Sequence, residues 1–260
     1  MFIKIMIEYE LDCKKECGEI MNTYKPLIAL SLLSTIIIAC STAKTPSITL
    51  KERLHNAYLD VIEAKEDNLR PLVCFTQDDE KVTWNEEKNK VLLFTFHRYP
   101  SSYVDGEELI ITWGESWLCS LKEYETWYLD NKDNIKDKLL RTKQLLGMSD
   151  ESKNTYISSL WVNPNDVKRP AYITDPTKQM ELQFKEDETE EYKTWFANQY
   201  YYSYDVSKLP WTRLGYTYDW SEEAKDRYGL SEFIIWKGTI VTVEKTLTVE
   251  EYIATFEKTR

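Results

Sequence analysis

The sequence predicts an α+β fold, with a mostly antiparallel sheet flanked by several helices in a single domain. Segments with helical periodicity and segments with strand periodicity are interspersed along the chain. Turn signals such as Asp105-Gly106 separate neighbouring strand segments, which is typical of hairpins. The chain shows no regular repeat of strand, helix and strand, which is the pattern that predicts a parallel sheet.

The first helix is expected to begin near Leu50, because Leu50, Leu54 and Tyr58 recur at helical spacing. Thr49 and Glu52 have the spacing of a capping box, in which each side chain accepts a hydrogen bond from the other residue's backbone N–H. The sequence therefore predicts a helix that starts directly after Thr49.

Strands are expected to follow this helix. Short strands are predicted at residues 71–76 and 81–85. Residues 91–99 are apolar on both faces, and this favours a central strand. Residues 108–119 predict the next strand, so that the two longer strands form a hairpin with a loop at 100–106.

Two further capping boxes predict helix starts at Ser120 with Glu123 and at Thr248 with Glu251. The first opens a helical pattern that continues to Gly147. Glycine is a natural end for a helix because it accepts the left-handed conformation of the residue after the last turn.

The remaining elements are expected in the second half of the chain. One helix is predicted at 188–200, since its aromatic residues share one helical face. Residues 211–220 alternate as a strand does. The other strands are expected at 155–162, 178–184 and, as a pair, 230–247.

Residues 21–40 have the anatomy of an export signal. Lys25 is followed by an apolar core at 27–39, and small Ala39 precedes Cys40. The core is shorter than the roughly 20 residues that a membrane span needs. The ending Ile-Ile-Ala-Cys resembles the lipobox of bacterial lipoproteins. This resemblance implies cleavage before Cys40 and acylation of its thiol, for example with palmitate. A plain signal peptide and an uncleaved membrane helix remain open alternatives.

The chain is expected to divide into four parts. Residues 1–20 have a net charge of −2, which is unfavourable before an export signal, and they are interpreted as a mis-called N-terminal extension. Residues 21–39 form the signal peptide, residues 40–48 a lipidated tether, and residues 49–260 a single α+β domain. The predicted location is the cell envelope, where the lipid holds the domain outside the cytoplasm.

Composition excludes several classes of function. The formal net charge is −11, and about −10 without the first 40 residues, so nucleic acid is not expected as a partner. Only 7 glycines are present and no phosphate-loop or dinucleotide motif occurs, so no cofactor is expected. Cys74 and Cys119 could form a disulfide or remain buried thiols.

Several short segments are similar to a family of uncharacterised bacterial proteins. They include Phe-His-Arg-Tyr-Pro at 96–100, Trp-Gly-Glu-Ser-Trp at 113–117 and the longer segments 210–220 and 229–233. The resemblance spans roughly residues 70–255. It implies a single intact domain and transfers no chemistry.

Glu115 is a candidate for chemistry because it lies in an apolar strand segment. On strict alternation it shares a face with Leu109, Ile111, Trp113, Trp117 and Cys119. A carboxyl on such a face is desolvated, which raises its pKa and suits a general acid. Two structural alternatives stay open: a bulge at Gly114 that turns Glu115 outward, or a buried pair with an arginine.

His97 is one of only two histidines and ends the predicted central strand. Its imidazole could transfer protons near neutral pH, or it could be a satisfied core or loop histidine. No metal site is expected, because His55 lies on the distant first helix and no His/Cys spacing resembles a zinc site.

Arg213 and the aromatic residues around it are the candidates for binding. The guanidinium could hold a carboxylate or a sugar edge, or it could form a salt bridge to Glu115 or Glu232. The aromatic rings could stack on a sugar, or they could be core. The candidate stacking residues are Tyr200, Tyr201, Tyr202, Tyr216, Tyr218 and Trp220.

Three functions are consistent with these patterns. The first is an anchored, extracytoplasmic binding module with an aromatic-lined cleft, because no catalytic motif is evident. The alternative is an extracytoplasmic hydrolase or transferase that uses a pocket of Glu115, His97 and Arg213. A third possibility is an envelope protein that serves only assembly with partners.

Overall fold

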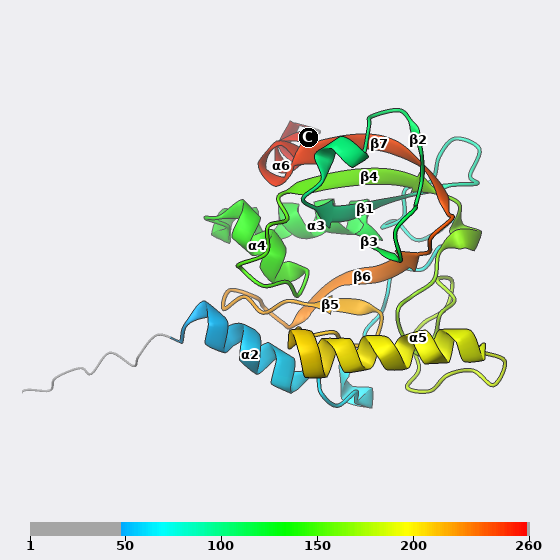
Figure 1. The fold of residues 1–260 in the computed structure, drawn as a ribbon. Helices are drawn as coiled ribbons and strands as arrows, with labels where there is room; N and C mark the ends of the chain where they lie inside the picture. Colours follow the sequence, from blue (N-terminus) through cyan, green and yellow to red (C-terminus); the bar gives the residue numbers. More distant parts are fainter. Residues whose placement is uncertain (1–47, 259–260) are drawn as a thin grey trace, which may run out of the picture. The chain divides into compact units, whose positions relative to one another are not determined.

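The computed structural model describes residues 48–258 (Figure 1). Their seven strands form one sheet in the order β2-β7-β4-β1-β3-β6-β5, and each neighbouring pair is antiparallel. The predicted α+β fold with an antiparallel sheet in one domain is confirmed. The expected extension, the signal peptide and Cys40 lie outside the described residues.

The elements lie in one compact unit of the chain, Ser47–Arg260. The strands are β1 Val91–His97, β2 Glu108–Ile110, β3 Ser116–Ser120, β4 Tyr156–Val162, β5 Tyr216–Tyr218, β6 Tyr228–Ile235 and β7 Ile240–Thr248. The α-helices are α2 Leu50–Asp60, α3 Leu121–Asn131, α4 Lys138–Leu145, α5 Glu190–Tyr201 and α6 Val249–Lys258. The 3₁₀ turns are Glu66–Asn68, Pro100–Ser102, Lys132–Asn134 and Pro164–Asp166, and a π-helical turn, Tyr202–Ser207, continues α5.

The predicted capping boxes start three helices, but only two of them are reciprocal. Thr49 and Glu52 exchange both hydrogen bonds at the start of α2, and Thr248 with Glu251 does the same before α6. Ser120 caps α3 alone. The Glu123 carboxylate instead accepts the backbone N–H of Ser231 at 2.7 Å and so joins the start of α3 to β6.

The central strand is confirmed, whereas the strand predicted at 108–119 is divided in two. β1 pairs with β4 on one side and with β3 on the other. β2 pairs only with β7, and β3 pairs with β1 and β6. Residues 113–115 turn between β2 and β3, so the strict alternation expected for Glu115 does not hold.

The sheet splits between two of its inner strands. β1 pairs with β4 over seven residues, but with β3 only at Leu93↔Ser120 and Phe94↔Cys119. Past Phe94, alternate carbonyls point away from β4, and the Phe96 carbonyl accepts from the side-chain amide of Asn154 at 2.9 Å. A side chain thus substitutes for the missing strand partner, and the split leaves room for a cleft.

Four of the other predicted strands are wrong in extent or absent. Arg213 and Gly215 have φ of 62° and 79°, so the chain turns there and the strand predicted at 211–220 is limited to β5. No strand forms at 178–184. No strand forms at 71–76, and 81–85 has only the isolated bridge from Trp84 to Val91. Between these segments the Asp79 carboxylate accepts the N–H groups of Cys74 and Lys81, and this favours turns over strand pairing.

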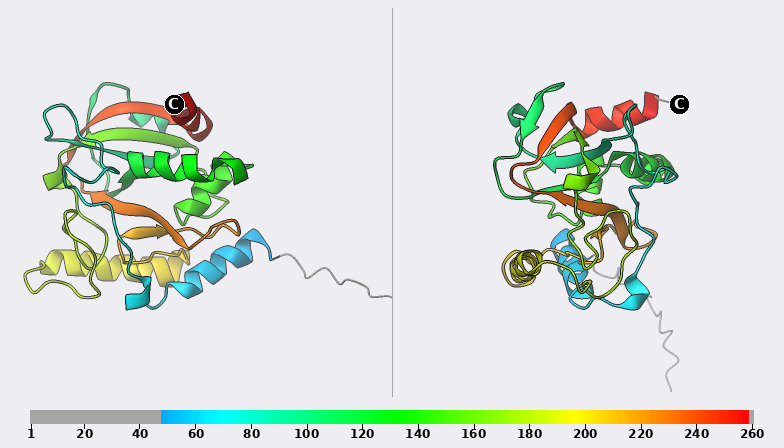
Figure 2. Two further views of the ribbon diagram at one scale, coloured as in Figure 1. Left: turned by 180° about the vertical axis from the view of Figure 1, so that it is seen from behind. Right: turned by 90° about the vertical axis from the view of Figure 1, so that its right-hand side faces the viewer.

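Helices cover the sheet on one face and along one edge. α3, α4 and α6 lie on the face seen in the left view of Figure 2, where Phe94 and Leu230 pack against Tyr124, Leu145 and Ile253. α2 and α5 lie side by side beneath the β5 edge (Figure 1). Their aromatic and aliphatic side chains form a separate core cluster with the segment around Trp211.

Candidate functional site

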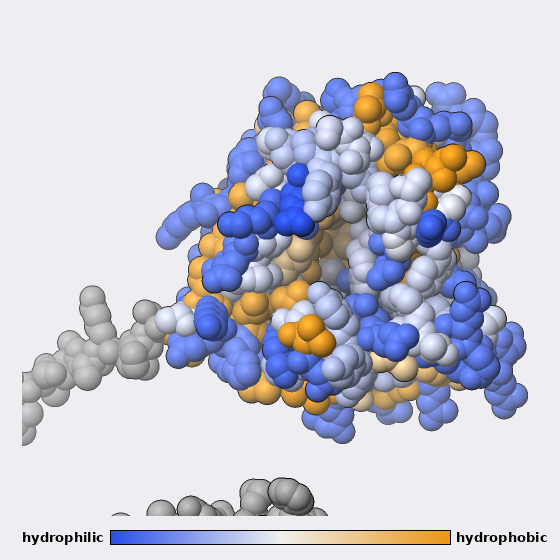
Figure 3. Space-filling model, viewed as in Figure 1, coloured by the Kyte–Doolittle hydropathy of each residue, from blue (hydrophilic) through white to orange (hydrophobic). Residues whose placement is uncertain are grey.

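A cleft of about 620 Å³ lies where β1 and β3 separate. Its walls come from β1, β3, β5 and β6, from the segment that follows α4, and from the π-helical turn after α5. Figure 3 shows the hollow at the centre of this face of the molecule. π-Helical turns occur often at functional sites, and this one brings Tyr202, Ser203 and Ser207 to the cleft.

Aromatic rings form much of the lining. Trp117 of β3 and Trp211 meet at 87° with their ring centroids 6.2 Å apart, so the two indoles make a corner. Nearer His97, the rings of Tyr103 and Trp113 meet edge to face at 6.0 Å. Such a lining offers ring faces and edges to a ligand, with few polar groups to fix its orientation.

Glu232 is the most unusual polar residue of the cleft. It lies on β6 directly opposite Cys119 of β3. Its Oε2 atom is fully enclosed and has no hydrogen-bond partner among the described residues. Burial raises the pKa of this carboxyl from its ordinary value of 4.5 to about 8. The Glu123 carboxylate holds the N–H of the preceding residue, Ser231, and so fixes the strand beneath it.

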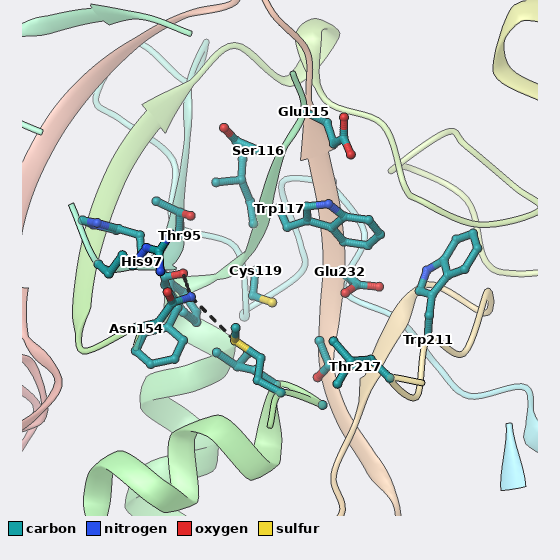
Figure 4. Close-up of a pocket in the computed structure, with 18 of the residues that line it drawn as sticks. Thr95, His97, Glu115, Ser116, Trp117, Cys119, Asn154, Trp211, Thr217 and Glu232 are labelled. Atoms are coloured by element: carbon teal, nitrogen blue, oxygen red, sulfur yellow. Dashed lines mark hydrogen bonds between the residues drawn. The ribbon is translucent and has the colours of Figure 1, made fainter. Parts of the chain in front are cut away.

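A second enclosed polar atom lies on the same wall. The Nε1–H of Trp211 is buried and finds no acceptor among residues 48–258. Figure 4 shows the carboxyl of Glu232 below Trp117 and turned toward the Trp211 indole. The wall therefore presents one unpaired acceptor and one unpaired donor beside an aromatic corner.

His97 lines the opposite wall, and both of its ring nitrogens are engaged. Nδ1 accepts the backbone N–H of Tyr99 at 3.1 Å, and Nε2 lies 2.7 Å from Oγ of Ser158. The Ser158 hydroxyl is 2.7 Å from Oγ1 of Thr246, which donates to the Tyr103 carbonyl. Only one set of proton positions satisfies all the hydrogen bonds in this series. In it, His97 is neutral and donates from Nε2 to Ser158.

Burial lowers the pKa of His97 from 6.5 to about 4. A neutral imidazole with both nitrogens occupied has no free position for a proton from the cleft. His97 therefore stabilises the end of β1 and its loop, which is the structural alternative that the sequence left open.

Glu115 also lines the cleft, but in the turn between β2 and β3 rather than on a strand face. It is half-exposed. In Figure 4 it lies above Trp117, apart from His97 on the opposite wall. The cleft therefore includes Glu115 and His97 without bringing them together.

Arg213 is not among the residues that line the cleft. Its guanidinium donates to the carbonyls of Val61 and Ile62 at 2.8 and 2.9 Å, and its Nε donates to the hydroxyl of Tyr204 at 3.0 Å. These bonds attach the end of α2 to the turn that precedes β5. The salt bridges considered with Glu115 and Glu232 are not formed.

Of the candidate stacking residues, Tyr200, Tyr201 and Tyr202 are exposed, whereas Tyr216, Tyr218 and Trp220 are buried in the scaffold. The hydroxyl of Tyr216 donates to the Asn68 carbonyl, that of Tyr218 to the Asp60 carboxylate, and the Trp220 indole to the Met148 carbonyl. Of these three, only Tyr216 lines the cleft. Tyr202 also lines the cleft, together with the indoles of Trp113, Trp117 and Trp211.

Cys74 and Cys119 are separate, buried thiols rather than a disulfide. Burial raises the pKa of both, which disfavours the reactive thiolate. Cys119 lies in the cleft beside Glu232. Within the described residues, no group of three His, Cys, Asp or Glu side chains is placed to hold a metal ion.

Comparisons with protein-family models, curated proteins and solved structures find no match to this chain. The resemblances to lipoprotein signals and to a bacterial family therefore remain predictions. Between residues 48 and 258, no helix has both the length and the apolarity needed to cross a membrane.

Sequence reasoning considered Glu232 only as a salt-bridge partner and did not consider Trp211 as a site residue. The signal for Glu232 was present, because it is the one acidic residue in the apolar run 230–235. The argument that selected Glu115 applies better to Glu232, since β6 is a regular strand there. No local pattern indicates that Trp211 lies near it.

Proposed function

We propose that this chain is a membrane-anchored bacterial lipoprotein whose domain binds a ligand outside the cytoplasm, in the cleft between β1 and β3. The observation that carries the binding function is the pair of enclosed, unpaired polar atoms, Oε2 of Glu232 and Nε1 of Trp211. They lie in an aromatic-lined cleft large enough for a small molecule or for one residue of a larger ligand.

Energetics favour a ligand at this position. A buried donor or acceptor without a partner costs about 1–3 kcal/mol of stability, and natural proteins rarely leave two on one wall without a functional reason. A ligand that pairs with both atoms recovers this free energy on binding. The aromatic corner adds apolar surface for the ligand to cover.

The geometry supports binding better than catalysis. A hydrolase or transferase built on Glu115, His97 and Arg213 needs these groups at one place. Arg213 is committed to main-chain carbonyls outside the cleft, and His97 has both nitrogens occupied. The raised pKa of Glu232 suits a general acid, but the structure does not bring Glu115, His97 and Arg213 together beside it.

A ligand panel tests the binding function. Residues 47–260, which form one compact unit, are titrated with glycans, peptides and small metabolites while tryptophan fluorescence is measured. Ser207→Trp places a large ring in the cleft wall. It should lower the affinity of any ligand that binds there at least about tenfold, or 1.4 kcal/mol. Ser221→Trp, the same change at a half-buried serine that does not line the cleft, should leave affinity unchanged. A panel without binders, or binders indifferent to Ser207→Trp, would contradict the proposal.

The anchor has a separate test. Cys40→Ser should release the chain from membranes and abolish labelling with a fatty-acid analogue, because the proposed acceptor thiol is lost. Labelling that persists in the variant would show that Cys40 is not the acceptor.

A further inference from the structure

We propose that the ligand of the cleft is an organic amine, bound as its ammonium ion to Glu232 within the corner of Trp117 and Trp211, and that it carries an oxygen acceptor next to the amine for the Trp211 N–H. This inference rests on the proposed binding function and specifies the ligand's chemistry. Three independent features of the cleft support it.

The first feature is charge. The acidic residues of the lining are Glu115 and Glu232, and its only Lys or Arg is Arg98. Arg98 is turned to its neighbour, since its Nε donates to the Tyr99 hydroxyl at 2.7 Å and its guanidinium lies over that ring. The cleft therefore offers a carboxyl without a counter-ion, and an ammonium group is the partner that a buried carboxylate needs.

The second feature is the aromatic corner. Trp faces attract cations most strongly among the aromatic side chains, and the attraction grows when the cation is desolvated. Trp117 and Trp211 meet at 87°, and Figure 4 shows the Glu232 carboxyl below Trp117. An ammonium held by Glu232 therefore lies beside indole surface. An anionic ligand is disfavoured by the negative faces of the same rings.

The third feature is the unpaired Trp211 N–H. An indole N–H donates only, so an ammonium cannot satisfy it. The ligand must bring an acceptor to the same wall as its amine. An ether, hydroxyl or carbonyl oxygen two or three bonds from the nitrogen supplies such an acceptor, as in amino alcohols, amino sugars and amino-acid amides.

Three matched probes and two variants test this ligand class. 2-Phenoxyethylamine carries a ring, an ether oxygen and an amine. 3-Phenylpropylamine lacks the oxygen, and 2-phenoxyethanol lacks the charge. Affinities for residues 47–260 are measured by calorimetry. 2-Phenoxyethylamine should bind tightest. The affinity for 2-phenoxyethanol, which lacks the charge, should be at least about tenfold lower.

The variants assign each contact. Glu232→Gln keeps the shape of the side chain. It should lower the affinity for both amines at least about tenfold, or 1.4 kcal/mol, whereas the affinity for 2-phenoxyethanol should change little. Trp211→Phe keeps a ring but removes the N–H. It should lower the affinity for 2-phenoxyethylamine about fivefold more than the affinity for 3-phenylpropylamine. Circular dichroism confirms that each variant is folded before its affinity is used.

Several results would overturn the inference. They are equal or tighter binding of 2-phenoxyethanol, amine binding that survives Glu232→Gln, and no binding of any probe. If the ligand panel still yields neutral or anionic ligands that Ser207→Trp excludes, the amine class is wrong and the binding function stands. If the panel also yields none, the binding function is wrong too.

Discussion

Glu232 on β6 lies directly across the strand pair from Cys119 on β3, and this register places a carboxyl without a counter-ion in the cleft wall. The neighbours on that wall include a thiol, two indoles and Thr217, whose hydroxyl donates to the Leu145 carbonyl. The chain could have buried an apolar residue here at lower cost. The position of this carboxyl therefore supports the proposed binding role better than a contribution to stability.

Glu232 should make stability depend on pH in a defined direction. Its pKa is raised from 4.5 to about 8 in the fold, so the folded state binds the proton more tightly than the unfolded state. The stabilisation is complete below about pH 4.5 and is lost as pH rises through about 8. The neighbouring Cys119 and Tyr192 have raised pKa values and stay protonated over this range.

Glu232→Gln removes this dependence. From pH 4.5 to 8 the melting temperature of the wild type should fall relative to that of the variant by several degrees, about 2–4 °C per kcal/mol for a domain of this size. Thermal unfolding of both proteins over a pH series measures the difference. A difference that stays constant with pH would show that Glu232 is ionised throughout.

His97 should remain neutral well into the acid range. Its pKa is lowered from 6.5 to about 4 by burial, so its contribution to stability is present above about pH 6.5 and is lost as pH falls through about 4. Nitrogen-detected NMR of the two histidines should show His97 as the Nε2–H tautomer with a midpoint near pH 4. His97→Gln assigns the signal. A midpoint near 6.5, or the Nδ1–H tautomer, would disprove the hydrogen-bond chain.

The buried pair of Arg141 and Asp219 should contribute strongly to stability. The guanidinium makes two bonds of 2.9 and 2.5 Å to the carboxylate and joins α4 to the segment after β5. Arg141→Met leaves the Asp219 charge unpaired and should cost about 3–5 kcal/mol in urea unfolding. Lys138→Met, on the same helix, breaks the exposed pair with Glu257 and should cost less than about 1 kcal/mol. Equal effects of the two changes would contradict this assignment.

Gly229 is required because β5 and α4 approach the backbone of β6 there. A Cβ at this position would lie 2.1 Å from Oγ1 of Thr217 and 2.4 Å from the Leu145 carbonyl oxygen. Gly229→Ala should therefore destabilise the fold by about 2–3 kcal/mol in denaturant unfolding. The matched change Gly114→Ala meets no atom within 4 Å and should change stability by less than about 0.5 kcal/mol. A tolerated Gly229→Ala would mean that these elements are further apart.

Local patterns predicted the helix starts well, because a capping box needs only residues that are three positions apart. The exception is instructive. The Glu123 carboxylate leaves its own helix end for Ser231, which is 108 positions away, and no local pattern reports such a partner.

The absence of long-range information also explains the errors in the predicted strands. Alternation at 211–220 gave no sign that Arg213 adopts a left-handed conformation, which a non-glycine residue rarely does. Arg213 is held there by carbonyls of residues 61 and 62, a contact that exists only in the folded chain. Alternation also continued through residues 113–115, where the chain turns from one side of the sheet to the other.

The sequence suggested an aromatic-lined cleft and a desolvated carboxyl as two separate hypotheses. The structure places a buried carboxyl and several aromatic rings in one cleft. The carboxyl is Glu232 rather than Glu115, because β6 keeps its alternation and the 108–119 segment does not. The pairing with Trp211 depends on the turn before β5, so it could not be read from the sequence.

The most direct test of a binding site at Glu232 and Trp211 is NMR of the nine indole N–H groups during titration with 2-phenoxyethylamine. The signals of Trp211 and Trp117 should move together with one dissociation constant. Those of Trp84 and Trp161, which donate to Thr76 and Glu244 outside the cleft, should stay in place. Shifts confined to Trp84 and Trp161, or a Trp211 signal that does not move at saturation, would contradict binding in the cleft.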